Sequence, residues 1–387
     1  MSGRTVRVWL VAGVAGLAAT LLGALADPRQ AAFSYLTAFA FATTLAVGAL
    51  LFVMIAHVAG GAWFVTLRRL TETVAATLPA LALLALPVLV AMPALYPWVP
   101  PLDGLAPHLR ELVRHKAPYL NVPFFVIRTV AYFAIWIGVG ACLRRWSAAQ
   151  DGGGDAAALV ARQRRLSGGG LPFVALALTF AAFDWLMSLE PEWYSTIYGI
   201  YVFAGGFVGA IALVTVLARR AERARRLEGL VTVEHYHALG KLLLTFVIFW
   251  AYIAYAQFFI IWIGDVPEDV SWYALRLRGS WGAVAGALAV GHFALPFAAL
   301  LSWRLKRRPA ALGAVAWWLI ALHYLDVYWL VVPTLHPDGA RPHWLDLAAL
   351  AGVVGVAVAF GGWRLRGVAL VPASDPSLAA ALRFETS

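Results

Sequence analysis

The stretch SYLTAFAFATTLAVGALLFVMIAHVAGGAWF (34–64) contains no Asp, Glu, Lys or Arg. About 20 apolar residues are enough for a helix to cross the ~30 Å hydrocarbon core of a bilayer. The stretch therefore predicts a transmembrane helix. Because it is longer than a single crossing requires, we expect the helix to tilt or to protrude from the membrane.

Other apolar stretches on both sides of 34–64 are long enough, or nearly so, to span a membrane. With it, they lie at about 8–26, 34–64, 73–96, 121–143, 171–189, 195–218, 239–263, 279–303, 310–332 and 344–363. The stretches are continuous rather than alternating, and the strands of membrane barrels are only about 10 residues long. We therefore predict an all-α polytopic membrane protein with about ten transmembrane helices.

The composition agrees with this class of protein. Of the 387 residues, 62% are hydrophobic and 13% are charged, whereas a soluble domain is about 45–50% apolar and about 25% charged. The net charge of +10 is compatible with a nucleic-acid partner. However, the basic residues lie in short runs between the apolar stretches, so we expect a lipid bilayer as the surroundings and no nucleic acid.

The distribution of Lys and Arg predicts the orientation of the chain. If the N-terminus and the even-numbered loops share one side, that side holds 22 of the 30 basic residues, the other side holds 7, and Arg128 lies within the fourth stretch. Cytoplasmic loops carry the excess of Lys and Arg. The count favours ten helices with both termini in the cytoplasm.

The N-terminus has some features of a signal peptide. Arg4 and Arg7 precede an apolar run that ends near Ala24-Leu25-Ala26. Cleavage there would leave nine helices. The run is longer than the apolar region of most signal peptides, so we favour an uncleaved first helix.

Two long loops suggest how the chain is organised. Residues 97–120, rich in Pro, are expected outside, whereas residues 145–170 are expected inside and carry two Gly-Gly-Gly runs, 152–154 and 168–170. We read 151–170 as a flexible linker between an N-terminal half (1–150, helices 1–4) and a C-terminal half (171–368, helices 5–10), followed by a cytoplasmic tail (369–387). Helices 2–5 and 6–9 then form two four-helix groups with two flanking helices.

Few ionisable residues lie within the apolar stretches. A charge at the bilayer centre costs about 2.5–3.5 kcal/mol, so such residues usually face a bundle interior or a wet cavity. His323 and Asp326 are three residues apart in the ninth stretch and share a helix face. They can exchange a proton or form a structural hydrogen bond to a neighbouring helix.

Asp184 and His292 each have two interpretations. Asp184, in the fifth stretch, either lines the outer mouth of a polar path with Ser188 or pairs with Arg128. His292, in the eighth stretch, either carries protons or hydrogen bonds, or binds a b-type haem together with His323. The spacing of the two histidines is not diagnostic of haem.

His237 and Lys241 lie one turn apart near the inner start of the seventh helix. They form either a proton entrance or a solvated helix end. Other hydroxyl and amide groups could extend a hydrogen-bonded chain through the membrane. These supporting groups are Ser188, Tyr252, Tyr255, Gln257, Tyr324 and Tyr328.

Other features concern packing and redox chemistry. Gly205 and Gly209 form a G-x-x-x-G motif, which ordinarily indicates close helix packing. The single cysteine, Cys142, excludes an internal disulfide, a Cys-ligated cluster and a C-x-x-C-H haem attachment. We expect no catalytic residue, metal site or covalently bound cofactor in this chain.

Four runs carry a resemblance to a known family. They are FDWLMSLEPEWYSTIYGIYVFAGGFVGA (183–210), HYHALGKLLLTFVIFWAYIAYAQFFIIW (235–262), GHFALPFAALLS (291–302) and HYLDVYWLVVP (323–333). The order of these runs resembles the F subunit of bacterial alternative complex III, a quinol:cytochrome c (or oxidase) oxidoreductase. That subunit, often labelled quinone-binding subunit 2, is related to the NrfD/polysulfide-reductase membrane family. The resemblance covers about 183–333, and residues 1–170 match only in helix pattern and size.

The resemblance implies a fold, partners and a role. The fold is two four-helix bundles with two flanking helices in the bacterial inner membrane. The partners are the related C subunit, an iron–sulfur subunit and c-type cytochromes, which hold the clusters and haems that carry electrons from menaquinol. This subunit has no redox centre and is thought to carry a proton path. Mapped onto this sequence, the path residues are Asp184, His237, Lys241, His292, His323 and Asp326.

Several alternatives remain. Menaquinone or menaquinol binding is one, and a purely structural membrane anchor is another. A secondary transporter is less favoured, because the two four-helix groups start from the same side and are not inverted repeats. Two departures from the family pattern, Ala238 in place of an acidic residue and Gly264-Asp265 after Trp262, leave the completeness of the proton path open.

Overall fold

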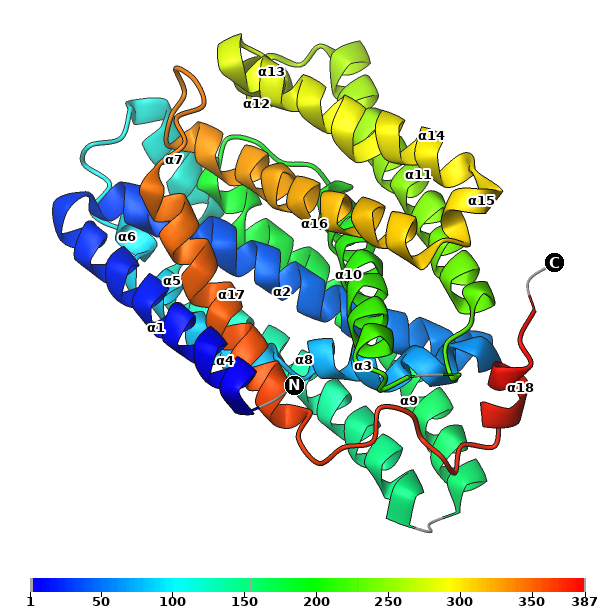
Figure 1. Cartoon of the computed structure of the whole chain (residues 1–387). Coiled ribbons are helices and arrows are strands. Elements are labelled where there is room, and N and C mark those ends of the chain that lie inside the picture. Colours follow the sequence, from blue (N-terminus) through cyan, green and yellow to red (C-terminus); the bar gives the residue numbers. More distant parts are fainter. Residues whose placement is uncertain (1–2, 153–154, 228, 386–387) are drawn as a thin grey trace.

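The computed structural model describes residues 3–152, 155–227 and 229–385. Every regular element within these ranges is a helix (Figure 1). In this part of the chain, ten helical segments are long and apolar enough to cross a membrane. The predicted fold class is confirmed, and the side on which the termini lie stays a prediction.

Ten segments form the body of the molecule. They are α1 (Gly3–Ala26), α2 (Pro28–Ala59), η1 (Ala62–Phe64) with α3 (Val65–Ala75), α4 (Leu78–Leu84) and α5 (Leu86–Val90), α8 (Val122–Ala149) with η2 (Gln150–Gly152), α9 (Ala156–Trp185) with η3 (Met187–Leu189), α10 (Tyr198–Arg223), α11 (Val233–Gly264), α13 (Gly279–Leu288) with η4 (Ala289–Ala294) and α14 (Leu295–Leu301), α16 (Pro309–Val331) with η5 (Val332–Thr334), and α17 (Trp344–Arg364). The shorter helices are α6 (Met92–Leu95), α7 (Pro107–Lys116), α12 (Pro267–Arg276), α15 (Trp303–Lys306) and α18 (Leu378–Leu382).

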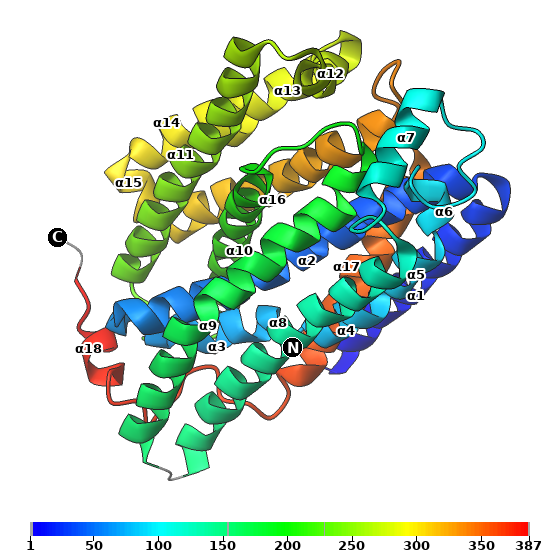
Figure 2. The ribbon, with the colours of Figure 1, turned by 180° about the vertical axis from the view of Figure 1, so that it is seen from behind.

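Helix α2 lies at the centre of the molecule and is buried from Gln30 to Met54. It contacts α9 and α3 on one side and α10, α16 and α17 on the other (Figures 1 and 2). The helix begins earlier than predicted, because the Asp27 carboxylate accepts from the Gln30 N–H at 2.9 Å and Pro28 occupies its first position. It ends at Gly60, whose left-handed φ of 66° terminates the helix. Residues 34–59 of this stretch therefore belong to one long helix, 28–59, and residues 62–64 begin the next spanning segment.

The two four-helix groups are visible in the contacts. Helices α3–α5, α8 and α9 surround one side of α2, and α10, α11, α13–α14 and α16 form the second bundle. Helices α1 and α17 lie side by side on one flank, and α11–α15 lie on the opposite flank (Figure 1). At the α1–α17 contact, a Cβ added to Gly16 would lie 2.4 Å from the backbone nitrogen of Gly352. Glycine is thus required there for the two backbones to meet.

Some segment boundaries differ from the sequence-based expectation. The third spanning segment begins at Ala62 rather than near residue 73, and it is divided at Pro79 and Pro87, which lie in the first turns of α4 and α5. Proline cannot donate the backbone hydrogen bond that a continuous helix needs. The region 151–170, expected as a flexible linker, is helical from Ala156 onward, so the glycines at 168–170 lie inside α9. Gly153 and Gly154 lie outside the described residues.

The C-terminal tail packs against the body of the protein up to the last described residue, Glu385. The side chain of Asp375 is bound by Arg68 of α3 at 2.7 Å, and the ring of Phe384 stacks on Trp63 of η1 with centroids 6.0 Å apart. The segment after α17 therefore closes the end of the molecule at which α2 ends and α3 begins.

Candidate functional site

The carboxyl group of Asp326 lies at a junction of three helices in the second bundle. Asp326, on α16, is 2% exposed. Its Oδ1 accepts a hydrogen bond from the Tyr201 hydroxyl on α10, and its Oδ2 accepts from the Trp250 indole N–H on α11 at 3.2 Å. Among the described residues, no Lys or Arg lies beside it. A buried carboxyl group with two donors and no counter-ion has the chemistry of a proton carrier.

His323 lies one turn before Asp326 on α16 and contacts α2. The hydroxyl of Thr44 lies 2.9 Å from His323 Nε2 and 3.0 Å from the Phe41 carbonyl oxygen. Thr44 therefore holds the His323 ring through Nε2. His323 Nδ1 is buried and has no hydrogen-bond partner among the described residues.

His292 approaches the same site from the eighth spanning segment. It lies in η4, a π-helical turn, and its ring packs on Trp250 with centroids 4.2 Å apart. Both ring nitrogens are buried without a hydrogen-bond partner in the described part of the chain. Buried polar atoms of this kind are usually satisfied by ordered water, and π-helical turns occur frequently at functional sites.

The G-x-x-x-G motif provides room for this cluster. A Cβ added to Gly205 would lie 3.1 Å from both Asp326 Oδ2 and His323 Nδ1, and one added to Gly209 would lie 3.0 Å from the His323 ring. The carboxylate and the unpartnered ring nitrogen therefore border the same small residue. The motif on α10 accommodates these two side chains, in addition to bringing helices together.

A groove of about 610 Å³ opens beside the Asp326 cluster, between α11, α12 and α13–η4. Its lining is mainly apolar, and its polar members include Tyr201, Trp250, Gln257 and Tyr273. Tyr252 and Tyr255 also line it, but their side chains are 64% and 62% exposed. The two tyrosines predicted to extend a buried chain are thus at the rim, on the surface that a bilayer would cover.

A second set of hydrogen bonds lies further along α11 toward its C-terminus. Gln257 Nε2 lies 3.1 Å from the Tyr273 hydroxyl on α12, and the Ser195 hydroxyl donates to Gln257 Oε1 at 3.2 Å. Burial raises the pKa of Tyr273, so its hydroxyl retains its proton. These groups connect the groove to the loop before α10.

Glu190 and Arg276 close this end of the second bundle. Arg276 is 1% exposed, its guanidinium group lies 3.8 Å from the centre of the Trp272 ring, and it donates to Glu190 Oε1 at 2.6 Å. The Thr334 hydroxyl also donates to Glu190 at 3.0 Å. Glu190 is partly exposed, so its carboxylate can reach the water at this end of the bundle.

Asp184 is part of a separate ion pair. Its carboxylate accepts from Arg128 Nε and a terminal guanidinium nitrogen, each at 2.8 Å, and from the Tyr132 hydroxyl at 2.6 Å. Ser188 donates to the backbone carbonyl of Asp184 and not to its carboxylate. All these residues belong to the first bundle. The geometry corresponds to the pairing interpretation of Asp184.

His237 and Lys241 are distant from the Asp326 cluster. His237 is buried near the start of α11, 4.0 Å from Glu234, whereas Lys241 is exposed. Trp250 follows His237 by 13 residues, which is about 20 Å along a helix. The buried α11 side chains in this interval are apolar, and they include Leu243 and Val247.

Tyr324 and Tyr328 face away from Asp326. The Tyr324 hydroxyl donates to the backbone carbonyl of Asp346 at 3.3 Å, and the Tyr328 ring packs on Trp281 with centroids 5.8 Å apart. The structure thus brings together His292, His323 and Asp326, and it places Tyr201 and Trp250 with them. Sequence reasoning missed these last two residues.

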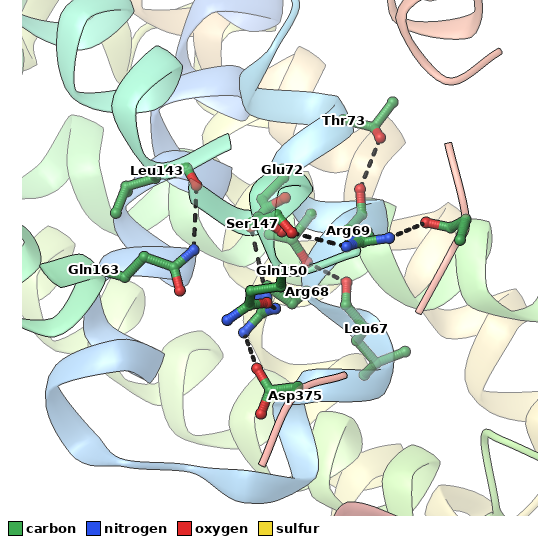
Figure 3. Close-up of polar contacts among 12 residues, drawn as sticks. Leu67, Arg68, Arg69, Glu72, Thr73, Leu143, Ser147, Gln150, Gln163 and Asp375 are labelled. Atoms are coloured by element: carbon green, nitrogen blue, oxygen red, sulfur yellow. Dashed lines mark hydrogen bonds and ion pairs between the residues drawn. The ribbon is translucent and has the colours of Figure 1, made fainter. Parts of the chain in front are cut away.

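A second buried polar cluster lies at the other end of the molecule (Figure 3). Arg68 binds Asp375 at 2.7 Å and lies 3.6 Å from Glu72, and Arg69 binds Asp151 at 2.7 Å. Arg68 and Arg69 are 3% and 2% exposed, and they join α3 to the end of α8 and to the C-terminal tail.

The fold and the Asp326 cluster define a polytopic helical membrane protein with a buried, uncompensated carboxyl group. No protein-family model matches the sequence, and no curated protein matches it. Within the described ranges, no group of three or more His, Cys, Asp or Glu residues is arranged to hold a metal ion.

Proposed function

We propose that this chain is an integral membrane subunit of a bacterial respiratory quinol:cytochrome c (or oxidase) oxidoreductase, similar to the F subunit of alternative complex III. Its role is to carry protons during quinol oxidation. The observation that supports this role is the Asp326 carboxyl group, which is buried between Tyr201 and Trp250 and lies next to His323. The haems and iron–sulfur clusters belong to partner subunits.

The proton route that the contacts favour runs from Asp326 toward the outer end of the second bundle. Tyr201 is bound to Asp326 and lines the groove, where the next polar side chains are Gln257 and Tyr273. Glu190 lies beyond them. The opposite direction along α11 is apolar for about 20 Å. Exchange with the outer surface is therefore the shorter polar route.

Purification of the tagged chain in mild detergent tests the assignment to a complex. We expect it to co-purify with a multihaem c-type cytochrome and an iron–sulfur subunit, and the preparation to show the visible spectrum of c-type haem. Subunits are identified by mass spectrometry. A colourless protein without partners would contradict the respiratory assignment and make solute transport the leading hypothesis.

Quinol binding in the groove is a second candidate function. The groove is apolar, opens on the surface that a bilayer covers, and places the Tyr201 hydroxyl and Gln257 where a quinol ring could form hydrogen bonds. Isoprenoid quinols are dissolved in lipid and reach such a groove without crossing water. The donor set fits a quinol as substrate.

Filling the groove separates the two candidates. Ala285 lines it, whereas Ala287 is exposed on the same helix, α13, outside it. If a quinol must occupy the groove, Ala285→Phe should lower quinol oxidation by about tenfold or more, because the ring takes up space that the quinol needs; tenfold corresponds to about 1.4 kcal/mol. Ala287→Phe should have no effect. Steady-state quinol oxidation by the purified complex measures this. Equal activity in both variants would leave only the proton-carrying role.

A purely structural role predicts a different pattern. In that case substitutions at Asp184, His292 and Asp326 would change the amount of assembled complex without changing the protons moved per electron. The proton-to-electron ratio of the assembled fraction therefore distinguishes an anchor from a proton carrier.

A further inference from the structure

An open depression lined by arginines lies where α8 and α17 end. Its volume is about 330 Å³, and it is lined by Arg144 of α8 and by Trp363, Arg364 and Arg366 at the end of α17. The basic distribution of the chain predicts that this end of the molecule is cytoplasmic. None of these four residues belongs to the proposed proton route.

In the described part of the chain, Arg144, Arg364 and Arg366 form no ion pair with a carboxylate. Ion pairs join Arg68 to Asp375 and Arg69 to Asp151, and Glu72 lies 3.6 Å from Arg68. Glu72 and Arg69 are also within electrostatic range of Arg144, but neither lines the depression. The local carboxylates are therefore already engaged by other arginines.

The Arg144 side chain is nevertheless held in place by a hydrogen bond. Arg144 donates a hydrogen bond to the backbone carbonyl of Arg364, in the last turn of α17, where a cation is favoured by the helix dipole. This contact uses one of the five N–H donors of a guanidinium group. Arg364 Nε is buried without a hydrogen-bond partner in the described structure. Donors therefore remain for an anion.

We propose that this depression binds the phosphate headgroup of an anionic phospholipid from the cytoplasmic leaflet. Guanidinium groups bind phosphate oxygens through paired, charge-assisted hydrogen bonds. Trp363 is 54% exposed at the rim, as is usual for an aromatic residue at the headgroup level. Both helices that supply the arginines are long enough to cross the bilayer. A lipid therefore reaches the site by lateral diffusion, with its acyl chains along the apolar faces of these helices.

The test uses the full-length chain, delipidated in a neutral detergent and titrated with phosphatidylglycerol, phosphatidylcholine or inorganic phosphate. Native mass spectrometry counts the bound lipid. We expect tighter binding of phosphatidylglycerol than of phosphatidylcholine. Each basic residue that lies against the headgroup contributes about a fivefold change in affinity for anionic lipid. Arg366→Gln should thus weaken phosphatidylglycerol binding by about fivefold, and Arg144→Gln with Arg364→Gln by about thirtyfold.

Arg145→Gln is the matched control, because Arg145 is exposed on α8 next to Arg144 but does not line the depression. It should retain full affinity. Arg366 is exposed, so its variant is expected to fold even if the double variant does not. Unchanged phosphatidylglycerol binding in folded Arg366→Gln protein, or equal binding of the two lipids, would overturn the proposal. Inorganic phosphate that displaces phosphatidylglycerol at equal concentration would assign the site to a free anion and also overturn it.

Discussion

Asp326→Asn is expected to remove most of the proton translocation of the complex while quinol oxidation continues. Asparagine has the size of aspartate, but it cannot bind and release a proton in the physiological range. Its amide oxygen can still accept from Trp250, which leaves its amide nitrogen beside Tyr201. Loss of a proton-transferring group typically lowers the rate of the step by about a hundredfold or more. The measurement is the proton-to-electron ratio of the whole complex in vesicles.

Two tyrosine variants supply the control. Tyr201→Phe removes the hydroxyl that binds Asp326 and should lower the ratio as well. Tyr236→Phe removes a comparable hydroxyl, bound to Glu222 at 2.6 Å outside the cluster, and should leave the ratio unchanged. A normal ratio in Asp326→Asn would rule out Asp326 as the proton carrier. If the proton-to-electron ratio fell equally in both tyrosine variants, the cause would be impaired assembly of the complex and not loss of the Asp326 contact.

Arg128→Met should be the most destabilising single substitution in the first bundle. It leaves the Asp184 carboxylate, which is 0% exposed, without its paired guanidinium group. Removing one member of a buried ion pair costs about 3–5 kcal/mol. Thermal unfolding in detergent, followed by tryptophan fluorescence and size-exclusion chromatography, measures the loss.

The double variant Arg128→Met with Asp184→Leu tests the reason for this loss. It removes both charges, so its stability should return most of the way to that of the unmodified protein. Tyr132→Phe, which deletes one hydrogen bond to Asp184, should cost only about 1–2 kcal/mol. If the double variant is as unstable as Arg128→Met, packing around Arg128, and not the uncompensated charge, determines stability.

The helices of this protein were predictable, because length and the absence of charge are local properties. The shared face of His323 and Asp326 was predictable for the same reason, since three residues are nearly one turn. The side chains that contact this pair from other helices could not be predicted. Tyr201 and Trp250 lie 125 and 76 residues from Asp326 in the sequence. Which face of α10 and α11 turns toward α16 depends on packing that periodicity does not reveal.

The helix ends were less predictable than the helices. Hydropathy extends the second stretch to residue 64, but Gly60 in a left-handed conformation stops the helix at Ala59. Glycine runs usually suggest flexibility, yet residues 168–170 continue α9 because the surrounding segment supports the helix. Arg128 and Asp184 were recognised as possible partners, and their bidentate contact became evident only in three dimensions.

The buried cluster of Figure 3 also has a consequence for the order in which the protein can mature. Arg68 and Arg69 are synthesised early, but Asp375 and the carbonyl of Ala369, which they bind, are made about 300 residues later. Arg69 can pair with Asp151 well before that, but until then Arg68 has only Glu72 and the side chain of Gln150 beside it. The third spanning segment therefore completes its contacts at this end of the molecule only when the segment that follows α17 packs against it.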